Sequence, residues 1–265
     1  MAVESFADAP AGPLTVARRP PVRQQARPPL LSVVVPTYNE AANIGPFLEA
    51  LKAGLDPVTA GGYEVIVVDD ESPDGTGEVA TRISASWPDL RVVRRTGERG
   101  LASAVVRGWQ IARGDVLATI NADFQHPPSI LPEMFLKIEN ADLIVATRYA
   151  AEGSVGRFPL HRQFLSASAR RVGAFLVPKV FRRVSDPLSG CYMFRRQAIE
   201  DIELRPTGFK TLIEILARGR VENIAECGYT MQKRRSGRSN VRVRHWFAYL
   251  EQLRRIRGEL QRRRT

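Results

Sequence analysis

The chain has 265 residues, of which 44% are hydrophobic, so it can bury a substantial core and is too apolar to be a disordered protein. Its two cysteines, Cys191 and Cys227, stand alone, which argues against a disulfide framework and against a cysteine-rich zinc site. The formal charge is +11, but residues 233–265 contain twelve Lys/Arg and two Glu and so carry +10 of it. This C-terminal concentration of positive charge indicates an anionic surface as partner.

The N-terminal residues 1–29 contain six prolines and four arginines and show little apolar periodicity. This composition predicts a disordered tail. The first residues do not form the apolar core of a signal peptide because Glu4 and Asp8 interrupt them. No apolar run approaches the ~18 residues that a bilayer-spanning helix needs. We therefore expect a cytoplasmic protein that contacts the cytoplasmic face of a membrane only peripherally.

From residue 31 onward, short β-branched runs alternate with segments of helical periodicity. Strands are predicted at residues 31–35, 63–68, 90–94, 116–120, 143–147, 191–194 and 221–227, with helices between most of them. Strands that alternate with helices of ten to fifteen residues predict an α/β fold, with a mostly parallel sheet and helices on both faces. In the helix after residue 100, a stripe of small residues predicts close packing on the sheet.

Three polar clusters follow predicted strands, at residues 36–40, 69–75 and 121–125. In parallel sheets, ligands bind beyond the carboxyl ends of strands. Asn121, Asp123 and Gln125 alternate along the chain, and an extended backbone would place all three on one face. Three oxygen-bearing side chains suit a hard divalent cation together with a phosphate. An Asx turn that ends the strand explains the same residues equally well.

Two segments combine basic and large apolar side chains. Residues 153–185 contain no acidic residue, which indicates an interfacial helix pair or, alternatively, a solvated basic face over an ordinary core stripe. Residues 241–265 predict a basic amphipathic helix that lies on a membrane surface. Its expected apolar face consists of Val243, Trp246, Phe247, Leu250, Leu253, Ile256 and Leu260.

Several familiar motifs are absent. The segment from Asp70 to Gly75 imitates the start of a calcium loop, but Thr81 stands where that loop needs a bidentate glutamate. There is no Walker A sequence, no GxGxxG and no GxSxG. The three histidines are too scattered along the sequence to suggest a metal cluster.

Eight blocks of the sequence together resemble a known family. They are VVVPTYNE (33–40), VVDDESPDGTGE (67–78), RTGERGLASAVVRGW (95–109), NADFQHPP (121–128), ATRY (146–149), DPLSGCYMF (186–194), GFKTLIEIL (208–216) and RRSGRSN (234–240). In this order they resemble the blocks of the dolichol- or polyprenyl-phosphate mannose synthases, which are inverting family 2 glycosyltransferases. The resemblance implies a Rossmann-like fold of the glycosyltransferase A type over residues 30–240, between the tail 1–29 and the helix 241–265.

The resemblance also implies an activity, the transfer of mannose from GDP-mannose to a polyprenyl (dolichyl) phosphate with Mg²⁺ or Mn²⁺ as cofactor. The implied partners are the nucleotide-sugar donor, the polyprenyl phosphate lipid, an anionic membrane surface and a possible separate membrane-anchoring protein. UDP-glucose as donor and a catalytically silent membrane-associated homologue are the alternatives. Nucleic-acid binding through the arginine-rich tail is disfavoured, because the aromatic residues of the tail share a helical face with Leu and Ile.

The family's functional positions transfer to this chain residue by residue. The implied nucleotide-sugar site consists of Pro36, Tyr38, Glu40, Val68, Asp70, Asn121, Ala122, Asp123, Gln125, Arg148 and Arg234. The implied metal ligands are Asn121, Asp123 and Gln125, and the implied acceptor-phosphate site is Arg148, Arg162 and Ser166. Asp123, Arg148 and Arg234 are the implied catalytic residues.

This sequence departs from the family pattern at two positions. Where the family has the first carboxylate of the motif, this chain has Asn121. Where the family has a lysine late in the sequence, this chain has Asn240. The two changes remove one negative and one positive charge, so the formal charge of the site stays balanced. We hypothesise a retuned site in which Asp123 and Gln125 still hold the cation. No general base needs to be nominated, because a phosphate monoester with a second pKa of about 6 is largely a dianion at neutral pH.

Overall fold

The computed structural model describes residues 6–18, 30–60, 62–150, 152–156, 160–207, 210–236 and 243–262, with backbone alone at 160–163 and 243–244. The strands are β1 (Ala7–Asp8), β2 (Leu31–Thr37), β3 (Tyr63–Asp69), β4 (Leu90–Arg94), β5 (Val116–Thr119), β6 (Leu143–Thr147), β7 (Tyr192–Arg195) and β8 (Ile224–Gly228). The α-helices are α1 (Ala41–Thr59), α2 (Thr76–Ser84), α3 (Leu101–Ile111), α4 (Ile130–Lys137), α5 (Leu160–Leu176), α6 (Pro178–Phe181), α7 (Thr211–Arg218) and α8 (Val243–Arg262). Two 3₁₀ turns, η1 (Ile138–Asn140) and η2 (Arg196–Ala198), complete the elements.

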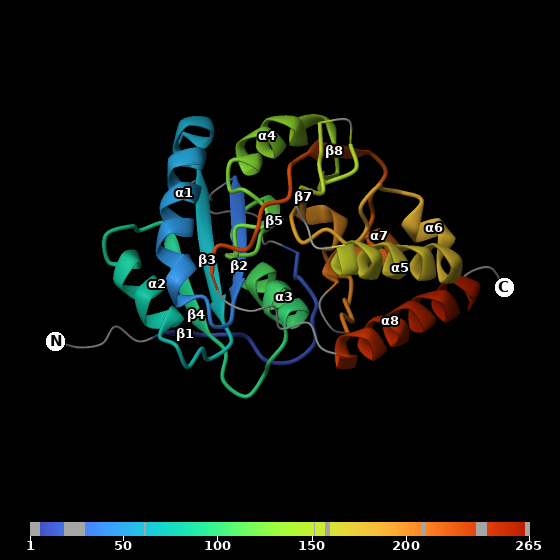
Figure 1. Cartoon of the computed structure of the whole chain (residues 1–265). Coiled ribbons are helices and arrows are strands. Elements are labelled where there is room, and N and C mark those ends of the chain that lie inside the picture. The colour runs from blue at the N-terminus through green and yellow to red at the C-terminus, as the bar shows by residue number, and fades with distance from the viewer. Residues whose placement is uncertain are drawn as a thin grey trace.

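The strands form one sheet in the order β1-β4-β3-β2-β5-β7-β6-β8. Figure 1 shows how the helices surround this sheet. All neighbours are parallel except β7, which runs antiparallel to both β5 and β6. Every residue of β2 and β3 is buried, as expected for β-branched strands covered on both faces. Helices α1, α2 and α4 cover one face of the sheet, and α3, α7 and α8 cover the other. The predicted mostly parallel α/β sheet is confirmed.

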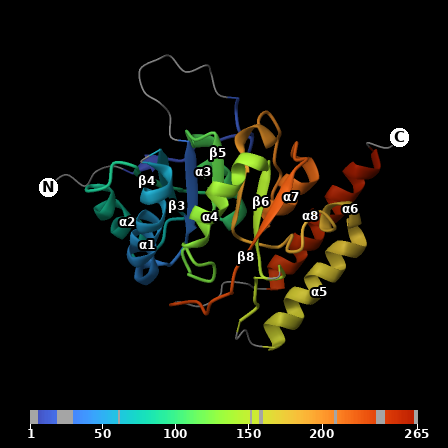
Figure 2. The same ribbon diagram turned by 90° about the horizontal axis from the view of Figure 1, so that it is seen from above.

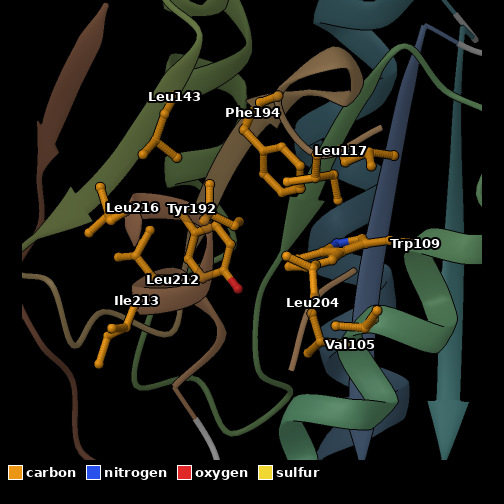
Figure 3. Packing of buried hydrophobic residues seen from close by; sticks show 14 of the residues in the cluster. Val105, Trp109, Leu117, Leu143, Tyr192, Phe194, Leu204, Leu212, Ile213 and Leu216 are labelled. Atoms are coloured by element: carbon orange, nitrogen blue, oxygen red, sulfur yellow. The ribbon is translucent and has the colours of Figure 1, made fainter. Parts of the chain in front are cut away.

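Trp109 of α3 fills the core between α3 and β7 (Figure 3). Its ring centroid lies 5.0 Å from that of Phe194 in an edge-to-face arrangement, and Tyr192 is also in ring contact with it. The preceding residue, Gly108, brings α3 close to the sheet. A Cβ atom at this glycine would lie only 2.4 Å from Cγ1 of Val34 on β2. The close packing predicted from the small-residue stripe is confirmed.

The expectation of a disordered tail is wrong for residues 6–18. Strand β1 pairs with the edge strand β4, and Val16 is fully buried in the core of the α3 face. Arg107 of α3 donates a hydrogen bond to the carbonyl oxygen of Gly12, and Gln110 donates to that of Pro13. The segment is held by backbone pairing, by these hydrogen bonds and by Val16 together with the partly buried Leu14, none of which composition reveals. Residues 1–5 and 19–29 lie outside the described part of the chain.

The C-terminal helix α8 is part of the same domain. Its side chains Tyr249, Leu253 and Ile256 are buried in the core that contains Trp109. The expectation that this apolar face lies on a membrane, with a domain boundary at residue 240, is therefore wrong for most of the helix. An amphipathic stripe has the same periodicity whether protein or lipid covers it, so the sequence could not separate the two.

The basic segment 153–185 contains a helix pair, as predicted, formed by α5 and the short α6. Helix α5 packs beside α8, and both lie together at one end of the molecule in Figures 1 and 2. The Tyr249 hydroxyl of α8 donates a 2.7 Å hydrogen bond to the carbonyl oxygen of Ala169 on α5. Within the described ranges, no helix combines the length and the apolar character needed to cross a bilayer.

Candidate active site

The loops that follow β2, β3 and β5 meet at the carboxyl edge of the sheet, and each contains one strained residue. Asn39, Glu71 and Phe124 have positive φ angles of 59°, 54° and 60°. Such a left-handed backbone costs a non-glycine residue roughly 1–2 kcal/mol and persists where the surrounding structure imposes it. Strain of this kind is frequent at functional sites, and here it marks the three loops that the polar clusters occupy.

Arg234 joins two carboxylates that are far apart in the sequence. Its Nη1 donates to Oε1 of Glu40 at 2.8 Å, and its Nη2 donates to Oδ2 of Asp123 at 2.8 Å. Glu40 precedes α1 and Asp123 follows β5, so the segment after β8 closes over both loops. Burial is the main effect that raises the pKa of each of these two carboxyls. Two carboxylates share one guanidinium, which leaves an excess negative charge at the site.

The three predicted metal ligands do not lie on an extended strand. Strand β5 ends at Thr119, and the chain turns sharply at Phe124. As a result, Asn121 and Gln125 line a cavity, whereas Asp123 is paired with Arg234. The expectation of simple alternation along a strand is wrong, because the turn rotates the side chains away from a two-residue period. The donor set of one carboxylate and two amide groups, next to excess negative charge, nevertheless fits Mg²⁺ or Mn²⁺.

The carboxylates of the acidic loop after β3 are bonded to the neighbouring loops. Asp70 accepts a 2.6 Å hydrogen bond from Nε of Arg95 and a 2.8 Å bond from the backbone N–H of Gly100. The carboxylates of Asp69 and Asp74 are likewise bonded within the neighbouring loops. The implied nucleotide position Asp70 therefore has internal partners for both oxygens and positions the loop before α3.

The other implied nucleotide positions lie at the same edge. Pro36 and Val68 are paired in the register of β2 and β3, and the Val68 side chain packs under α3. Val68 can therefore offer a ligand only its backbone. The Tyr38 ring is half-buried, with the guanidinium carbon of Arg99 at 5.7 Å from its centroid. Ala122 is buried beside Asp123.

A cavity of about 260 Å³ lies between this edge and the helices α5 and α8. It brings together four of the implied site residues, Asn121, Gln125, Arg148 and Ser166. The Arg162 side chain lies outside the described part of the chain, as does Asn240. The structure thus places the implied phosphate ligands Arg148 and Ser166 on one cavity.

The cavity also contains polar residues to which the sequence assigned no role. Asp186 accepts a 3.0 Å hydrogen bond from Nε of Arg148 at Oδ2, and Nη2 of Arg148 forms an ion pair with the same oxygen at 2.9 Å. Burial lowers the pKa of Lys210 to about 8, with help from Arg148. Burial, and then the positive charges of Arg148 and Lys210, lower the pKa of His126 to about 3. These residues lie in blocks that carried the family resemblance, which was the only available signal for them.

A model of the family named Glycosyl transferase family 2 matches residues 32–203. The chain is 40% identical over 237 residues to a dolichol-phosphate mannosyltransferase of Pyrococcus furiosus, in an alignment that covers 88% of this chain and 66% of that protein. It therefore spans just under two thirds of that relative. The dolichol-phosphate mannosyltransferase of Saccharomyces cerevisiae is 32% identical over 234 residues, with 85% of this chain and 86% of that protein covered.

Among solved structures, glucosyl-3-phosphoglycerate synthase from Mycobacterium tuberculosis in complex with Mn²⁺, UDP and glucosyl-3-phosphoglycerate is similar, with a TM-score of 0.57 and 24% identity. That alignment covers 84% of this chain and 76% of the other. Its complex with Mg²⁺ and UDP gives a TM-score of 0.55, with 78% and 72% covered. At this identity the likeness shows the fold, which is the glycosyltransferase A type. Fold and sequence agree, and the chain belongs to glycosyl transferase family 2, in the group of the dolichol-phosphate mannosyltransferases.

Proposed function

We propose that this glycosyltransferase transfers mannose from GDP-mannose to a polyprenyl phosphate, with inversion and with Mg²⁺ or Mn²⁺ as cofactor. The observation that supports the proposal is the arrangement of two groups of charged and polar residues at the same edge of the sheet. The acidic pair of Glu40 and Asp123 under Arg234 lies at the sheet edge, and the cavity with Arg148 and Ser166 begins beside it. A nucleotide-sugar donor and a phosphate acceptor need two such groups, a donor end and an acceptor end.

The donor end is built to neutralise a diphosphate. Asp123, together with the amide groups of Asn121 and Gln125, would hold a divalent cation that offsets the charge of the leaving group. Arg234 already lies between Glu40 and Asp123 and offers guanidinium donors to phosphate oxygens. The cation and Arg234 would both stabilise the negative charge that develops as GDP departs, which is the main demand of this reaction.

The acceptor end positions a phosphate monoester. A hydrogen bond and an ion-pair contact to Oδ2 of Asp186 hold the guanidinium of Arg148, and Ser166 of α5 lines the same cavity. A phosphate held there would attack the anomeric carbon through one of its oxygens while the bond from that carbon to the diphosphate breaks. GDP leaves with the electron pair of that bond. Attack from the opposite face inverts the anomeric configuration.

The helices at the cavity also present aromatic side chains to solvent. Phe164 and Phe175 of α5 are 71% and 81% exposed, and their spacing of eleven residues places them on the same face of the helix. Phe247 of the neighbouring α8 is 69% exposed. The exposed Arg171 lies between the two phenylalanines along α5. We infer that this face rests on an anionic membrane surface, so that the polyprenyl chain stays in lipid while its phosphate enters the cavity.

Replacing both Phe164 and Phe175 by serine should lower partitioning onto phosphatidylserine-containing vesicles at least tenfold. Each buried phenylalanine contributes ~1.5–3 kcal/mol, so even partial insertion of two rings accounts for this loss. Sedimentation with sucrose-loaded vesicles measures it. Leu136→Ser is the matched control, because Leu136 is 64% exposed on α4, on the opposite face of the sheet. Equal binding by the phenylalanine variant and the control would contradict the proposed docking face.

The transfer reaction itself is tested with labelled donors. The full chain is incubated with labelled GDP-mannose or UDP-glucose, a polyprenyl phosphate and Mg²⁺ or Mn²⁺, and label in the lipid phase is counted. We expect lipid label from GDP-mannose and none after chelation of the cation. Label from UDP-glucose alone would change the proposed donor. No label from either donor would favour a catalytically silent homologue, in which a separate membrane-anchoring protein could be the partner.

A further inference from the structure

His126 is a buried side chain without an internal partner. It follows Gln125 in the loop after β5, is only 6% exposed, and its ring contacts that of Tyr229 at a tilt of 34°, with 4.7 Å between the centroids. Among the described residues, neither Nδ1 nor Nε2 has a hydrogen-bond partner. Burying two ring nitrogens without partners disfavours folding. A buried imidazole that lines a cavity and has no hydrogen-bond partner is better explained by ligand binding than by a contribution to folding.

Asp186, which lines the same cavity, has a second unpaired atom. Its Oδ2 accepts hydrogen bonds from Arg148, but its Oδ1 has no partner within the described chain, and the residue is fully buried. His126 comes from the loop after β5, whereas Asp186 comes from the segment between α6 and β7. Two loops far apart in the sequence thus bring an unused imidazole, and a carboxylate with an unused oxygen, to the lining of one space of about 260 Å³.

The chemistry of these two groups selects the kind of ligand. A phosphate dianion offers only acceptor oxygens, so it cannot donate a hydrogen bond to the free Oδ1 of Asp186. A hydroxyl group both donates and accepts a hydrogen bond. An imidazole can exchange hydrogen bonds with a hydroxyl in either sense, and a carboxylate oxygen accepts from one. A ring that carries several hydroxyls therefore satisfies both residues, whereas Arg148 and Ser166 remain available to the acceptor phosphate.

We propose that His126 and Asp186 bind hydroxyl groups of the donor hexose and position the sugar for transfer. This inference rests on the proposed function, because it assigns the sugar subsite of the same reaction. It makes His126 a residue that determines which sugar is accepted. A site built to hydrogen-bond a substrate hydroxyl rejects analogues that lack it or present it elsewhere, because its buried groups are then left unpaired.

The test compares binding of the nucleotide with binding of the nucleotide sugar. Calorimetry with Mn²⁺ measures the affinities of wild type and His126→Phe for GDP, GDP-mannose, UDP and UDP-glucose. For the donor that wild type uses, we expect His126→Phe to lose about five- to tenfold in affinity, whereas its affinity for the corresponding nucleoside diphosphate changes less than twofold. His126→Asn, which keeps one donor and one acceptor, should recover part of the loss.

A packing role for His126 predicts different results. Phenylalanine keeps a ring in contact with Tyr229 and removes the two unpaired nitrogens, so the Tm of His126→Phe should equal or exceed that of wild type. The inference would be overturned if the ratio of the affinity for the nucleotide sugar to the affinity for the nucleotide were the same in His126→Phe as in wild type. A change confined to the KM of polyprenyl phosphate would also overturn it. If wild type transfers mannose and the ratio is unchanged, only this inference fails. If wild type transfers sugar from neither donor to the lipid, the proposed function fails with it.

Discussion

Asp123→Asn should lower the rate of mannosyl transfer by roughly 10²- to 10³-fold, because it removes the one carboxylate of the predicted metal set. Asp123 is also one of the two carboxylates that hold Arg234 in place. The change keeps the size of the side chain. Burial raises the pKa of Asp123, so its ionised form opposes folding at neutral pH, and the Tm of the variant should not fall. Initial rates at saturating Mn²⁺ measure the effect.

Asn121→Asp is the matched variant with the opposite expectation. It adds a carboxylate at the position where the family carries one, and a second negative charge should strengthen Mn²⁺ binding about tenfold. Calorimetric titration with Mn²⁺ alone gives this affinity without requiring turnover. An Asp123→Asn variant with wild-type rates, or an Asn121→Asp variant with unchanged Mn²⁺ affinity, would show that the cation is held elsewhere or is not needed.

Arg148→Met should lower stability and acceptor binding together. Asp186 is fully buried, and loss of its guanidinium partner leaves a buried carboxylate at a cost of about 3 kcal/mol or more. For a chain of this size, each kcal/mol lowers the Tm by roughly 2–4 °C, so a fall of about 10 °C is expected. Below the unfolding transition, the KM for polyprenyl phosphate should rise at least tenfold, because Arg148 is the described guanidinium on the cavity.

Arg196→Met separates the two effects. Arg196 is also buried, but it lies in η2 and donates to the carbonyl oxygens of Ala112 and Gly114, away from the cavity. Its loss should lower the Tm and leave the KM for polyprenyl phosphate unchanged. If both variants raised this KM equally, the effect of Arg148 would come from destabilisation alone, and its assignment to the acceptor phosphate would be wrong.

The local pattern of the chain was sufficient for most of the scaffold. The β-branched runs that became β2 and β3 are buried along their full length, and such runs form central strands in nearly any α/β sheet. Their alternation with helical segments then placed three polar clusters at one edge. That edge is where the structure brings Glu40, Asp123 and Arg234 together.

The local sequence pattern did not predict which part of the molecule covers an apolar residue or an apolar helix face. Val16 anchors the N-terminal segment, although the surrounding prolines and arginines have the composition of a disordered tail. In α8, Leu253 and Ile256 are covered by protein, although the stripe they belong to is equally suited to lipid. Whether an apolar face is covered by the rest of the protein or left exposed to solvent depends on packing between segments that are distant in the sequence.

The sequence by itself determined the α/β architecture, the edge of the sheet that carries the site, and the residue types that can hold a cation and phosphates. The tertiary structure alone decided how those residues pair. Arg234 reaches two carboxylates 194 and 111 positions earlier in the chain. It also decided that His126 and Asp186 line one cavity and that each has hydrogen-bonding atoms without a partner among the described residues. Sequence periodicity predicts which face of a helix or strand is apolar. Polar groups from distant loops can pair only after the folded sheet has brought those loops together.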